Sequence, residues 1–467
     1  MSKCSLKSTR DFTNGPIFFR ITAFAIPIML TGFLQIAYSM ADNIIVGKFS
    51  NDPLALAAVG STGSLNSLMI NLLLGIATGA GVVVAQFYGA RDDGRVSKSV
   101  HTAMLIGLFG GLIFSGIALV ISRPALLMLG TKSELIDSAV LYFRIICLGI
   151  PANSVYNYGA AILRGTGNSR TPLIILGSAG IINVLLNLFF VIACGMSVSG
   201  VAIATVASQV ISAAAVVIVL MRSTGKPFRL YLSRLKLEKG YLLRILRFGV
   251  PSGIQSSMFS IANVFMTSAV NTFPTTTITG VTIASNVDAL TLTSMNCFGS
   301  ACMTFTGQNY GAKKPDRIKK ILIYSIIQTV IVGAAVGALE LTFSDALISL
   351  YMSEEVVEKE AVIAAAKTVM RVILICYPIY GVLDSGSAAI KGLGYTFTAM
   401  IMSLVGICVM RIVWITVFFP MIGTLFALYL SYPITWTLTS ITSIVIFSVV
   451  FGKFKRSLTA KDAEIEI

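Results

Sequence analysis

The chain has 467 residues, of which 55% are hydrophobic and only 12% are charged, and its formal net charge is +15. A soluble domain carries roughly a quarter charged residues, so this composition excludes a soluble protein and indicates an integral membrane protein. At about 20 apolar residues per span, the length allows on the order of a dozen helices and no sizeable catalytic or nucleotide-binding domain. The longest polar stretch, from Arg222 to Arg247, is too short to form a core of its own.

Apolar runs long enough to cross a membrane occur twelve times when hydropathy is averaged over about 19 residues. The first six predicted spans are residues 20–47, 54–84, 98–121, 136–158, 171–193 and 198–221. The other six are residues 247–272, 279–305, 319–343, 361–385, 396–419 and 424–451. The first run is too long for the hydrophobic region of a signal peptide, so we expect it to remain as a span. The predicted fold class is therefore all-α and integral to the membrane.

Basic residues are distributed unequally between the two sides that twelve spans define. The connections on the side of the two termini hold 27 lysines and arginines, and those on the other side hold five. The positive-inside rule therefore predicts cytoplasmic N- and C-termini in a multi-pass protein of the cell membrane, plasma or inner. Anionic lipid headgroups are the expected partner of this charge, and nucleic acid is not.

Short sequences from the first half of the chain recur in the second half. The segment Gln86–Arg91 recurs as Gln308–Lys313, and the segment Arg164–Gly167 recurs as Lys391–Gly394. Six spans separate the copies, so both halves enter the membrane in the same direction and are related by an axis along the membrane normal. We expect two lobes of six helices around a central cavity, which is exposed to each side in turn as in secondary transporters.

The repeat and the basic connector also define the expected domains. They are an N-terminal lobe at 1–221, a cytoplasmic basic connector at 222–246, a C-terminal lobe at 247–451 and a cytoplasmic tail at 452–467. The seven cysteines show no CxxC spacing and lie mostly in apolar runs, so neither disulfides nor a metal site are expected. The glycine-rich segments lack the lysine and the strand of a phosphate-binding loop, so neither ATP nor another cofactor is expected.

The motifs in the first half carry a resemblance to a known family. They are Ala25-x-Pro27 with Gln35, Tyr38 and Asp42 in the first span, then Gln86-x-Tyr88-Gly89-Ala90 and Arg164-Gly165-x-Gly167. In order, spacing and repetition they resemble the multidrug and toxic compound extrusion (MATE) family, and the resemblance covers all twelve spans. It implies a bacterial-type efflux transporter whose first helix bends at the hinge residue Pro27.

Asp42 is the leading candidate for coupling transport to an ion. An ionisable group inside a bilayer costs several kcal/mol unless it is paired or faces water, so it is a functional hypothesis by default. Asp42 shares a helical face with Tyr38 and Gln35 and lies roughly 7 Å inside the outer end of its span. The alternative is a carboxylate at a helix end that lipid headgroups solvate.

The resemblance adds companions for Asp42 on two later spans. MATE proteins place an acid on span one, two Asn or Asp residues on span five and a Thr on span six, which match Asn183, Asn187 and Thr205 here. One carboxylate with amide and hydroxyl oxygens binds a proton, or sodium more weakly, because hard cations prefer oxygen ligands and negative charge. The alternative for the asparagine pair is hydrogen bonding between helices.

The second half contains two candidate carboxylates for a substrate cavity. Asp384 shares a helical face with Tyr380 and Tyr377, and Asp288 lies in the outer part of span eight. A carboxylate beside aromatic faces attracts organic cations, so these four residues are expected to line the cavity.

Three other charged or titratable residues receive structural assignments. Arg411, near the middle of span eleven, could neutralise Asp288 or Asp384 in a structural ion pair. Glu340 lies so close to the outer end of its span that we expect it to be solvated. The single histidine, His101, begins span three and is expected to be a boundary residue rather than a proton relay.

The sequence therefore predicts a secondary active antiporter that exports cationic or amphipathic compounds in exchange for protons or sodium by alternating access. The alternative is a lipid-linked oligosaccharide flippase of the same superfamily, whose members carry several arginines in the cavity for an anionic diphosphate. An enzyme is not expected, because one histidine at a helix boundary supplies no clustered nucleophile and base and no metal set. Small-molecule substrates and membrane lipids are the expected partners of a monomeric transporter.

Overall fold

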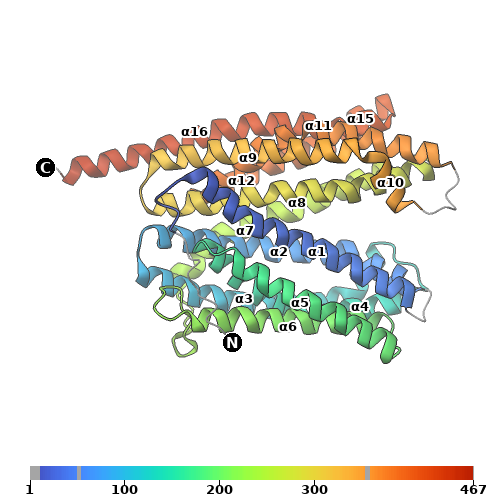
Figure 1. Cartoon of the computed structure of the whole chain (residues 1–467), viewed down its shortest axis with the longest axis horizontal. Helices are drawn as coiled ribbons and strands as arrows, with labels where there is room; N and C mark the ends of the chain where they lie inside the picture. The colour runs from blue at the N-terminus through green and yellow to red at the C-terminus, as the bar shows by residue number, and fades with distance from the viewer. Residues whose placement is uncertain (1–10, 50–53, 353–357, 466–467) are drawn as a thin grey trace. The chain divides into compact units, whose positions relative to one another are not determined.

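The computed structural model describes residues 11–49, 54–352 and 358–465, which are almost entirely helical and contain no β-strand (Figure 1). The elements of the first half are α1 (Ile17–Phe49), α2 (Ala55–Gly89), α3 (Asp93–Met128), α4 (Ile136–Gly165), α5 (Arg170–Leu188), the π-helix η1 (Phe189–Ala193), α6 (Val198–Arg222) and the 3-10 helix η2 (Leu232–Arg234). Those of the second half are α7 (Lys239–Val270), α8 (Thr275–Gly311), α9 (Pro315–Thr342), α10 (Ser344–Tyr351), α11 (Lys359–Gly392), α12 (Thr396–Ser403), the π-helix η3 (Leu404–Val409), α13 (Met410–Val413), the π-helix η4 (Trp414–Phe418), α14 (Phe419–Ile422), α15 (Leu425–Tyr429) and α16 (Ser431–Ile465).

Each of the twelve predicted spans coincides with a long helix or with a run of consecutive helices. Within the described residues, ten of these are both long and apolar enough to cross a membrane. The other two, α7 and α8, have 32 and 37 residues but carry more polar side chains. The predicted all-α fold of twelve transmembrane helices is confirmed.

Two features depart from the predicted straight helices. The span at 396–419 contains the π-helices η3 and η4 on either side of α13, so its hydrogen bonding is not regular along its length. Such π-helical turns are rare and frequently occur at functional sites. The short helix α10 follows α9 in a connection for which no helix was predicted.

The helices form two compact units, each of which contains a short segment from the other half of the sequence. Among the described residues, unit 1 comprises Asp11 and Leu30–Ser257, and unit 2 comprises Phe12–Met29 and the chain from Met258 onward. The first part of α1 therefore packs within unit 2, and the first part of α7 packs within unit 1. The repeat had placed all of α1 in the N-terminal lobe and most of α7 in the C-terminal lobe. In the structure the first segment of each of these two helices belongs to the other unit, and we call it the exchanged segment.

The internal repeat is visible in the backbone. Arg91 and Lys313 occupy equivalent positions after α2 and α8, and both adopt a left-handed conformation with φ of 57° and 55°. The amide of each donates a hydrogen bond to the carbonyl three residues earlier at 3.1 Å. Gly167 and Gly394, in the second repeated motif, have φ of 87° and 91°. The same helix-ending turns therefore close α2 and α8, and likewise α4 and α11.

The glutamine of the first repeated motif fixes the start of the exchanged segment in each unit. In unit 2, Gln308 Oε1 accepts a hydrogen bond from the Phe12 amide at 3.0 Å. In unit 1, Gln86 Oε1 accepts one from the Arg244 guanidinium on α7 at 2.9 Å. Both glutamines are buried, and the Phe12 ring stacks on Phe305 with centroids 3.8 Å apart. The two equivalent glutamines therefore accept hydrogen bonds from different donors, and each one holds the exchanged segment in its unit.

Glycines allow the first part of α7 to approach α2 closely within unit 1. A Cβ added to Gly79 would lie 2.4 Å from the Gly249 nitrogen, and one added to Gly75 would lie 2.4 Å from the Gly253 Cα. Backbones at this separation leave no room for a side chain, which is the common use of small residues between membrane helices.

α1 runs as one helix through Pro27. Proline has no backbone N–H, so the carbonyl of Ala23 receives no hydrogen bond from this position. Pro27 lies just before the point, between Met29 and Leu30, where α1 passes from unit 2 to unit 1. This placement suits a hinge, and the hinge role itself stays a prediction.

The basic connector contacts the start of α3 within unit 1. The Tyr231 amide donates to His101 Nε2 at 3.0 Å, so the other ring nitrogen, Nδ1, carries the proton and donates to the Ser97 carbonyl at 2.7 Å. Lys98 forms an ion pair with Glu238 of the connector at 3.5 Å. His101 is therefore fully hydrogen-bonded in a structural position, in line with its assignment as a boundary residue.

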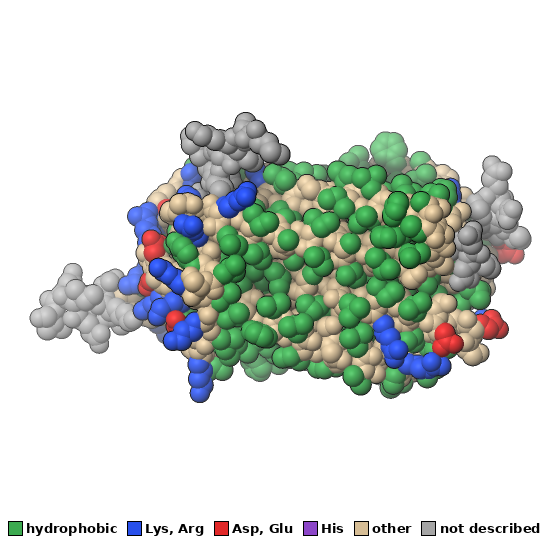
Figure 2. All heavy atoms as spheres, turned by 90° about the horizontal axis from the view of Figure 1, so that it is seen from below, with side chains coloured by type: hydrophobic (Ala, Val, Ile, Leu, Met, Phe, Trp, Pro, Cys, Tyr) green, Lys and Arg blue, Asp and Glu red, His purple; other side chains and the backbone are tan. Residues whose placement is uncertain are grey.

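Lysine and arginine side chains gather toward one end of the helices on the face shown in Figure 2, and hydrophobic side chains cover the middle of that face. Such an apolar band beside a basic end is typical of a protein that spans a membrane. Lys3, Lys7 and Arg10, which contribute to the basic count, lie outside the described residues.

Candidate functional site

Asp42 lies in the second part of α1, within unit 1, and is the one acidic residue of that helix. The helix is otherwise rich in Ile, Leu, Met, Ala and Phe, which explains both its helical conformation and its place in a membrane. The Asp42 side chain is half-buried, and its Oδ1 accepts a hydrogen bond from the Asn187 amide of α5. A carboxylate in such surroundings requires polar partners of this kind.

Asn183 and Asn187 extend this contact into a hydrogen-bond chain that joins α1, α5 and α6. They are four residues apart on α5, so both side chains lie on one face. The Asn187 amide nitrogen lies 3.3 Å from Asn183 Oδ1, and the Asn183 amide nitrogen lies 3.4 Å from Thr205 Oγ1. The Thr205 hydroxyl donates to the Val201 carbonyl at 2.9 Å. The structure thus brings together four of the predicted residues, and their coupling role stays a prediction.

One acceptor in this network has no partner. Asn187 is 0% exposed, and its Oδ1 is buried without a hydrogen bond. A buried acceptor left unpaired costs about 1–3 kcal/mol. A small cation beside Asp42 would relieve this cost, because carboxylate, amide and hydroxyl oxygens are the ligands that hard cations prefer. The arrangement can therefore bind and release a proton or a small cation at Asp42.

Tyr38 and Gln35, the other two residues predicted on this face, occupy different positions. The Tyr38 hydroxyl donates to the Gly177 carbonyl of α5 at 3.0 Å. Its ring lies against Gly180, where an added Cβ would be 1.7 Å from the ring. Tyr38 therefore sets how α1 packs on α5 beside the asparagines. The Gln35 side chain is exposed and lies outside the Asp42 network.

Sequence reasoning missed Tyr142 of α4 as a neighbour of Asp42. Its side chain is 7% exposed and lies close enough to interact electrostatically with Asp42. Tyrosine in an apolar helix gives no signal by itself, since most such residues belong to the core. Only the packing of α4 in unit 1 reveals its position.

The aromatic candidates of the second half bind two different polar residues in unit 2. The Tyr377 hydroxyl donates to Asp288, and the Tyr380 hydroxyl donates to Asn296 Oδ1 at 2.8 Å. The Tyr377 and Tyr380 rings lie 5.5 Å and 5.2 Å from the Trp436 ring of α16. Asn296 and Trp436 were not predicted, because neither lies on the same helix as the residues that it contacts.

Asp384 lies apart from these hydrogen bonds. Its Oδ2 is buried without a hydrogen-bond partner, and a Cβ added to Gly299 of α8 would lie 2.0 Å from that oxygen. It interacts electrostatically with Lys391, further along α11. Asp384 therefore occupies space that only a glycine on the neighbouring helix leaves free.

The expectation that Glu340 is solvated is wrong. Glu340 is 5% exposed, and Thr291 of α8 lies beside its carboxylate. Glu340 lies near the end of α9, but α10 follows at once and packs against α8, α9 and α11. Ser344 and Ile348 of α10 are 7% and 0% exposed. Depth counted from the end of a span misplaced Glu340 because it took no account of how α9 packs against α8, where Thr291 lies beside Glu340.

Arg411 lies in α13 between the two π-helices and is 4% exposed. Its guanidinium lies over the Tyr432 ring, 3.9 Å from the centroid. In the part of the chain that the structure describes, no ion pair joins Arg411 to Asp288 or Asp384. The proposed structural ion pair is therefore not found there.

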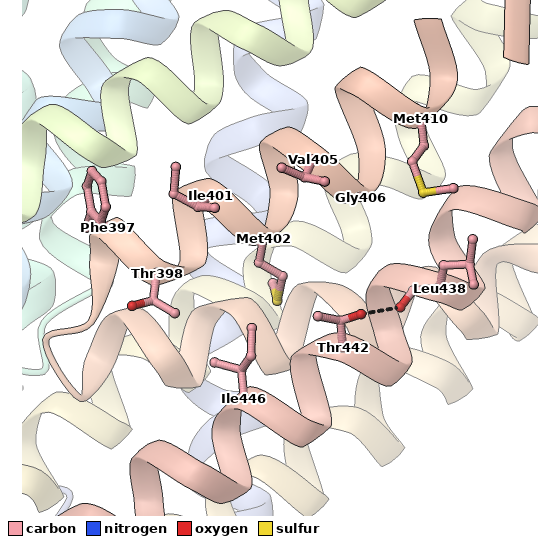
Figure 3. A pocket seen from close by; sticks show the side chains of 10 residues that line it. All are labelled: Phe397, Thr398, Ile401, Met402, Val405, Gly406, Met410, Leu438, Thr442 and Ile446. Carbon is pink, nitrogen blue, oxygen red and sulfur yellow. Dashed lines mark hydrogen bonds between the residues drawn. The ribbon is translucent and has the colours of Figure 1, made fainter. Parts of the chain in front are cut away.

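A groove of about 510 Å³ lies between α12, η3, α13 and α16 (Figure 3). Apolar side chains such as Phe397, Met402 and Leu438 line most of it. The Thr442 hydroxyl on its wall donates to the Leu438 carbonyl at 2.8 Å. No ionisable side chain is among the lining residues, so this groove does not contribute to ion binding.

Comparisons with known proteins agree with this architecture. The MatE family profile matches residues 27–189 and 251–417, which is more than half of the chain. The probable multidrug resistance protein YoeA of Bacillus subtilis is 26% identical over 92% of this chain and 89% of its own length. The probable multidrug resistance protein NorM of Thermotoga maritima is 23% identical over 83% of this chain and 82% of its own.

Solved structures share the fold. A MATE in the bent conformation superposes with a TM-score of 0.87 at 22% identity, and covers 96% of this chain and 98% of that chain. The outward-facing conformation of a multidrug resistance MATE family transporter of the MOP superfamily gives the same TM-score and identity over 97% and 99%. With the family match across both halves of the repeat, the chain belongs to the MatE family of multidrug and toxic compound extrusion transporters and is not an enzyme.

Proposed function

We propose that this protein exports cationic or amphipathic compounds across the cell membrane, in exchange for protons or sodium ions, by alternating access. The observation that carries the proposal is the Asp42 network, in which one half-buried carboxylate meets two buried asparagines and leaves one amide oxygen without a partner. The similar proteins from Bacillus subtilis and Thermotoga maritima are named probable multidrug resistance proteins, which supports drugs as the substrates that this protein exports.

The exchange follows from thermodynamic linkage between two ligands. If cation binding at Asp42 and substrate binding both depend on the shape of α1, each must weaken the other by the same coupling free energy. α1 suits this role because one helix holds Asp42 in unit 1 and begins in unit 2. A bend at Pro27 would change how the two parts of the helix are related.

The flippase alternative is not favoured. A carrier of an anionic diphosphate requires several cationic side chains in its binding region. Unit 2 instead contains the buried Glu340 and the half-buried Asp288 and Asp384, against Lys391, which interacts with Asp384, and Arg411, which lies over a tyrosine ring. Small cationic molecules and membrane lipids are therefore the proposed partners, with the protein as a monomer.

The proposed topology has both termini in the cytoplasm, because the basic connections lie on that side. A reporter fused after Lys461 and cysteine labels in the connector at 222–246 should both report cytoplasm. Labelling of that connector from outside intact cells would contradict the proposed orientation.

The decisive experiment measures export of a cationic dye in inverted membrane vesicles under an imposed proton gradient or an imposed sodium gradient. Transport with one gradient identifies the coupling ion. The Asp42→Asn protein, prepared at equal abundance, serves as the matched control, because asparagine keeps the volume and removes the charge. If neither gradient drives dye transport, or if Asp42→Asn transports as well as the unmodified protein, the proposal is wrong.

A further inference from the structure

The apolar groove of unit 2 lies at a depth where a membrane protein meets lipid tails. Its walls belong to two runs of helix, Thr396–Ile422 and Leu425–Thr459, that are each long and apolar enough to cross a membrane. Side chains on these walls are open to the surroundings, since Ile401 is 40% exposed, Val405 is 51% exposed and Leu438 is 43% exposed. An apolar hollow that opens outward within a span faces hydrocarbon rather than water.

The local packing of η3 on α16 explains why a hollow forms here. Gly406 has no side chain, and a Cβ added to it would lie 2.3 Å from Thr439 Oγ1 of α16. The two helices therefore come close at this point, and Met402 on the groove is only 5% exposed. The Thr442 hydroxyl is satisfied within its own helix, because it donates to the Leu438 carbonyl at 2.8 Å. A deep hollow with such a lining suits a flexible hydrocarbon chain.

The face of α16 that lines the groove continues to the basic end of this helix. At about 100° per residue, an arc of roughly 80° contains Leu438, Thr442, Ile446, Val449, Lys453 and Arg456. Lys453 and Arg456 are exposed, and among the side chains that the structure describes neither takes part in an ion pair. We propose that the groove binds one acyl chain of an anionic phospholipid, whose headgroup lies against Lys453 and Arg456.

The length of this face matches one leaflet of a bilayer. Figure 3 shows Phe397 and Ile446 at one end of the groove, and Met410 and Leu438 at the other. The distance along α16 from Leu438 to Lys453 is about 22 Å at 1.5 Å per residue. Half of a bilayer with its headgroups measures about 20–22 Å. In the proposed orientation this is the cytoplasmic leaflet, whose anionic lipids attract lysine and arginine.

The experiment uses a phosphatidylglycerol that carries a photoactivatable diazirine on one acyl chain. The purified full-length protein is placed in phosphatidylcholine nanodiscs with this probe and irradiated, and the labelled peptides are mapped. We expect saturable labelling within residues 396–410 and 438–446. Thr442→Phe fills the groove and should remove most of this labelling. Lys453→Gln should weaken probe binding by about fivefold, the effect of one basic residue near a lipid surface.

Two matched controls change α16 away from the groove. Thr437 is also exposed, and its hydroxyl donates to the Pro433 carbonyl at 2.7 Å, but it lies roughly 100° from Leu438 around the helix. Lys455 is exposed as well and lies on the same side as Thr437, roughly 100° from Leu438. Thr437→Phe and Lys455→Gln should therefore keep the labelling at the groove.

Competition identifies the class of ligand. Excess unlabelled phosphatidylglycerol should displace the probe, and excess phosphatidylcholine should displace much less of it. Equal displacement by the two lipids, displacement by a cationic dye, or equal losses of labelling in Thr442→Phe and Thr437→Phe would overturn the proposal. So would labelling spread evenly over the other helices. The readout is lipid binding, so its failure would leave the proposed efflux function to be judged by the vesicle experiment alone.

Discussion

The polar groups of unit 1 and unit 2 differ although the two halves share their helix-ending turns. In unit 1, Asp42 is the acid of a network whose other members are neutral amides and a hydroxyl. In unit 2, three buried or half-buried acids occur on α8, α9 and α11, and one of them, Asp288, accepts a hydrogen bond from the Tyr377 hydroxyl. The two halves therefore share their backbone conformation, but the polar side chains inside each half are different.

Removal of the Asp42 charge should have the largest effect. Asp42→Asn should fold and reach the membrane but lose gradient-driven efflux by at least about tenfold. This factor lies within the range that a typical coupling free energy of about 1–3 kcal/mol produces. Any substrate binding that remains should no longer vary with pH, because the Asp42 carboxylate, whose protonation weakens substrate binding, has been removed. Asp384→Asn should change which cations are accepted and keep the pH response. Dye transport and equilibrium binding between pH 6 and 8 check both variants, and a normal pH response of Asp42→Asn would make Asp384 the leading carboxylate.

Two glycine variants compare the packing that supports each acid. Gly180→Ala forces the Tyr38 ring away from α5, and an overpacked core of this kind loses about 1–3 kcal/mol of stability. Gly299→Ala displaces the Asp384 carboxylate instead. We expect the first to weaken the pH response of transport and the second to alter substrate preference only. Gly110→Ala, where an added Cβ meets nothing within 4 Å, is the control in thermal unfolding and transport assays.

The two repeat-related prolines test whether bending is specific to α1. Pro27→Ala restores a backbone donor and should leave folding intact while slowing efflux severalfold, because α1 connects Asp42 to unit 2. Pro251→Ala makes the same change in α7, which carries no acid, and should slow efflux less. Transport rates of purified, reconstituted proteins decide between them. Equal rates for Pro27→Ala and the unmodified protein would show that the bend is not part of the cycle.

His101 provides the smallest expected effect. His101→Leu removes the acceptor of the Tyr231 amide and leaves a donor unpaired, at a cost of about 1–3 kcal/mol if that amide stays buried. Transport and its pH dependence should be unchanged, since His101 lies at the connector and contacts neither acid group. A shifted pH profile in this variant would contradict its purely structural role.

The sequence predicted the helices from local rules, whereas the grouping of Asp42 with Asn183, Asn187 and Thr205 was implied by the resemblance to the MATE family. Apolar runs define spans, and Asn183 and Asn187 lie on one face of α5 by their spacing alone. The burial of Glu340 was not predictable in this way, since it depends on how the end of α9 packs against α8, where Thr291 lies beside it. The hydrogen bond of Tyr377 with Asp288 and the electrostatic interaction of Tyr142 with Asp42 join helices far apart in sequence, and periodicity within one helix carries no information on such pairs.

The exchange of leading segments between the units has a consequence for biosynthesis. Phe12 and Phe24 belong to one buried cluster with Phe305 of α8 and Phe454 of α16, so this segment finds its partners only after the ribosome has made α8 and most of α16. The amino-terminal half cannot complete its own structure while the ribosome is still synthesising the rest. A split version of the transporter should therefore assemble only when both fragments are produced together, and a cut within the connector at 222–246 leaves each fragment holding a helix start that the other requires.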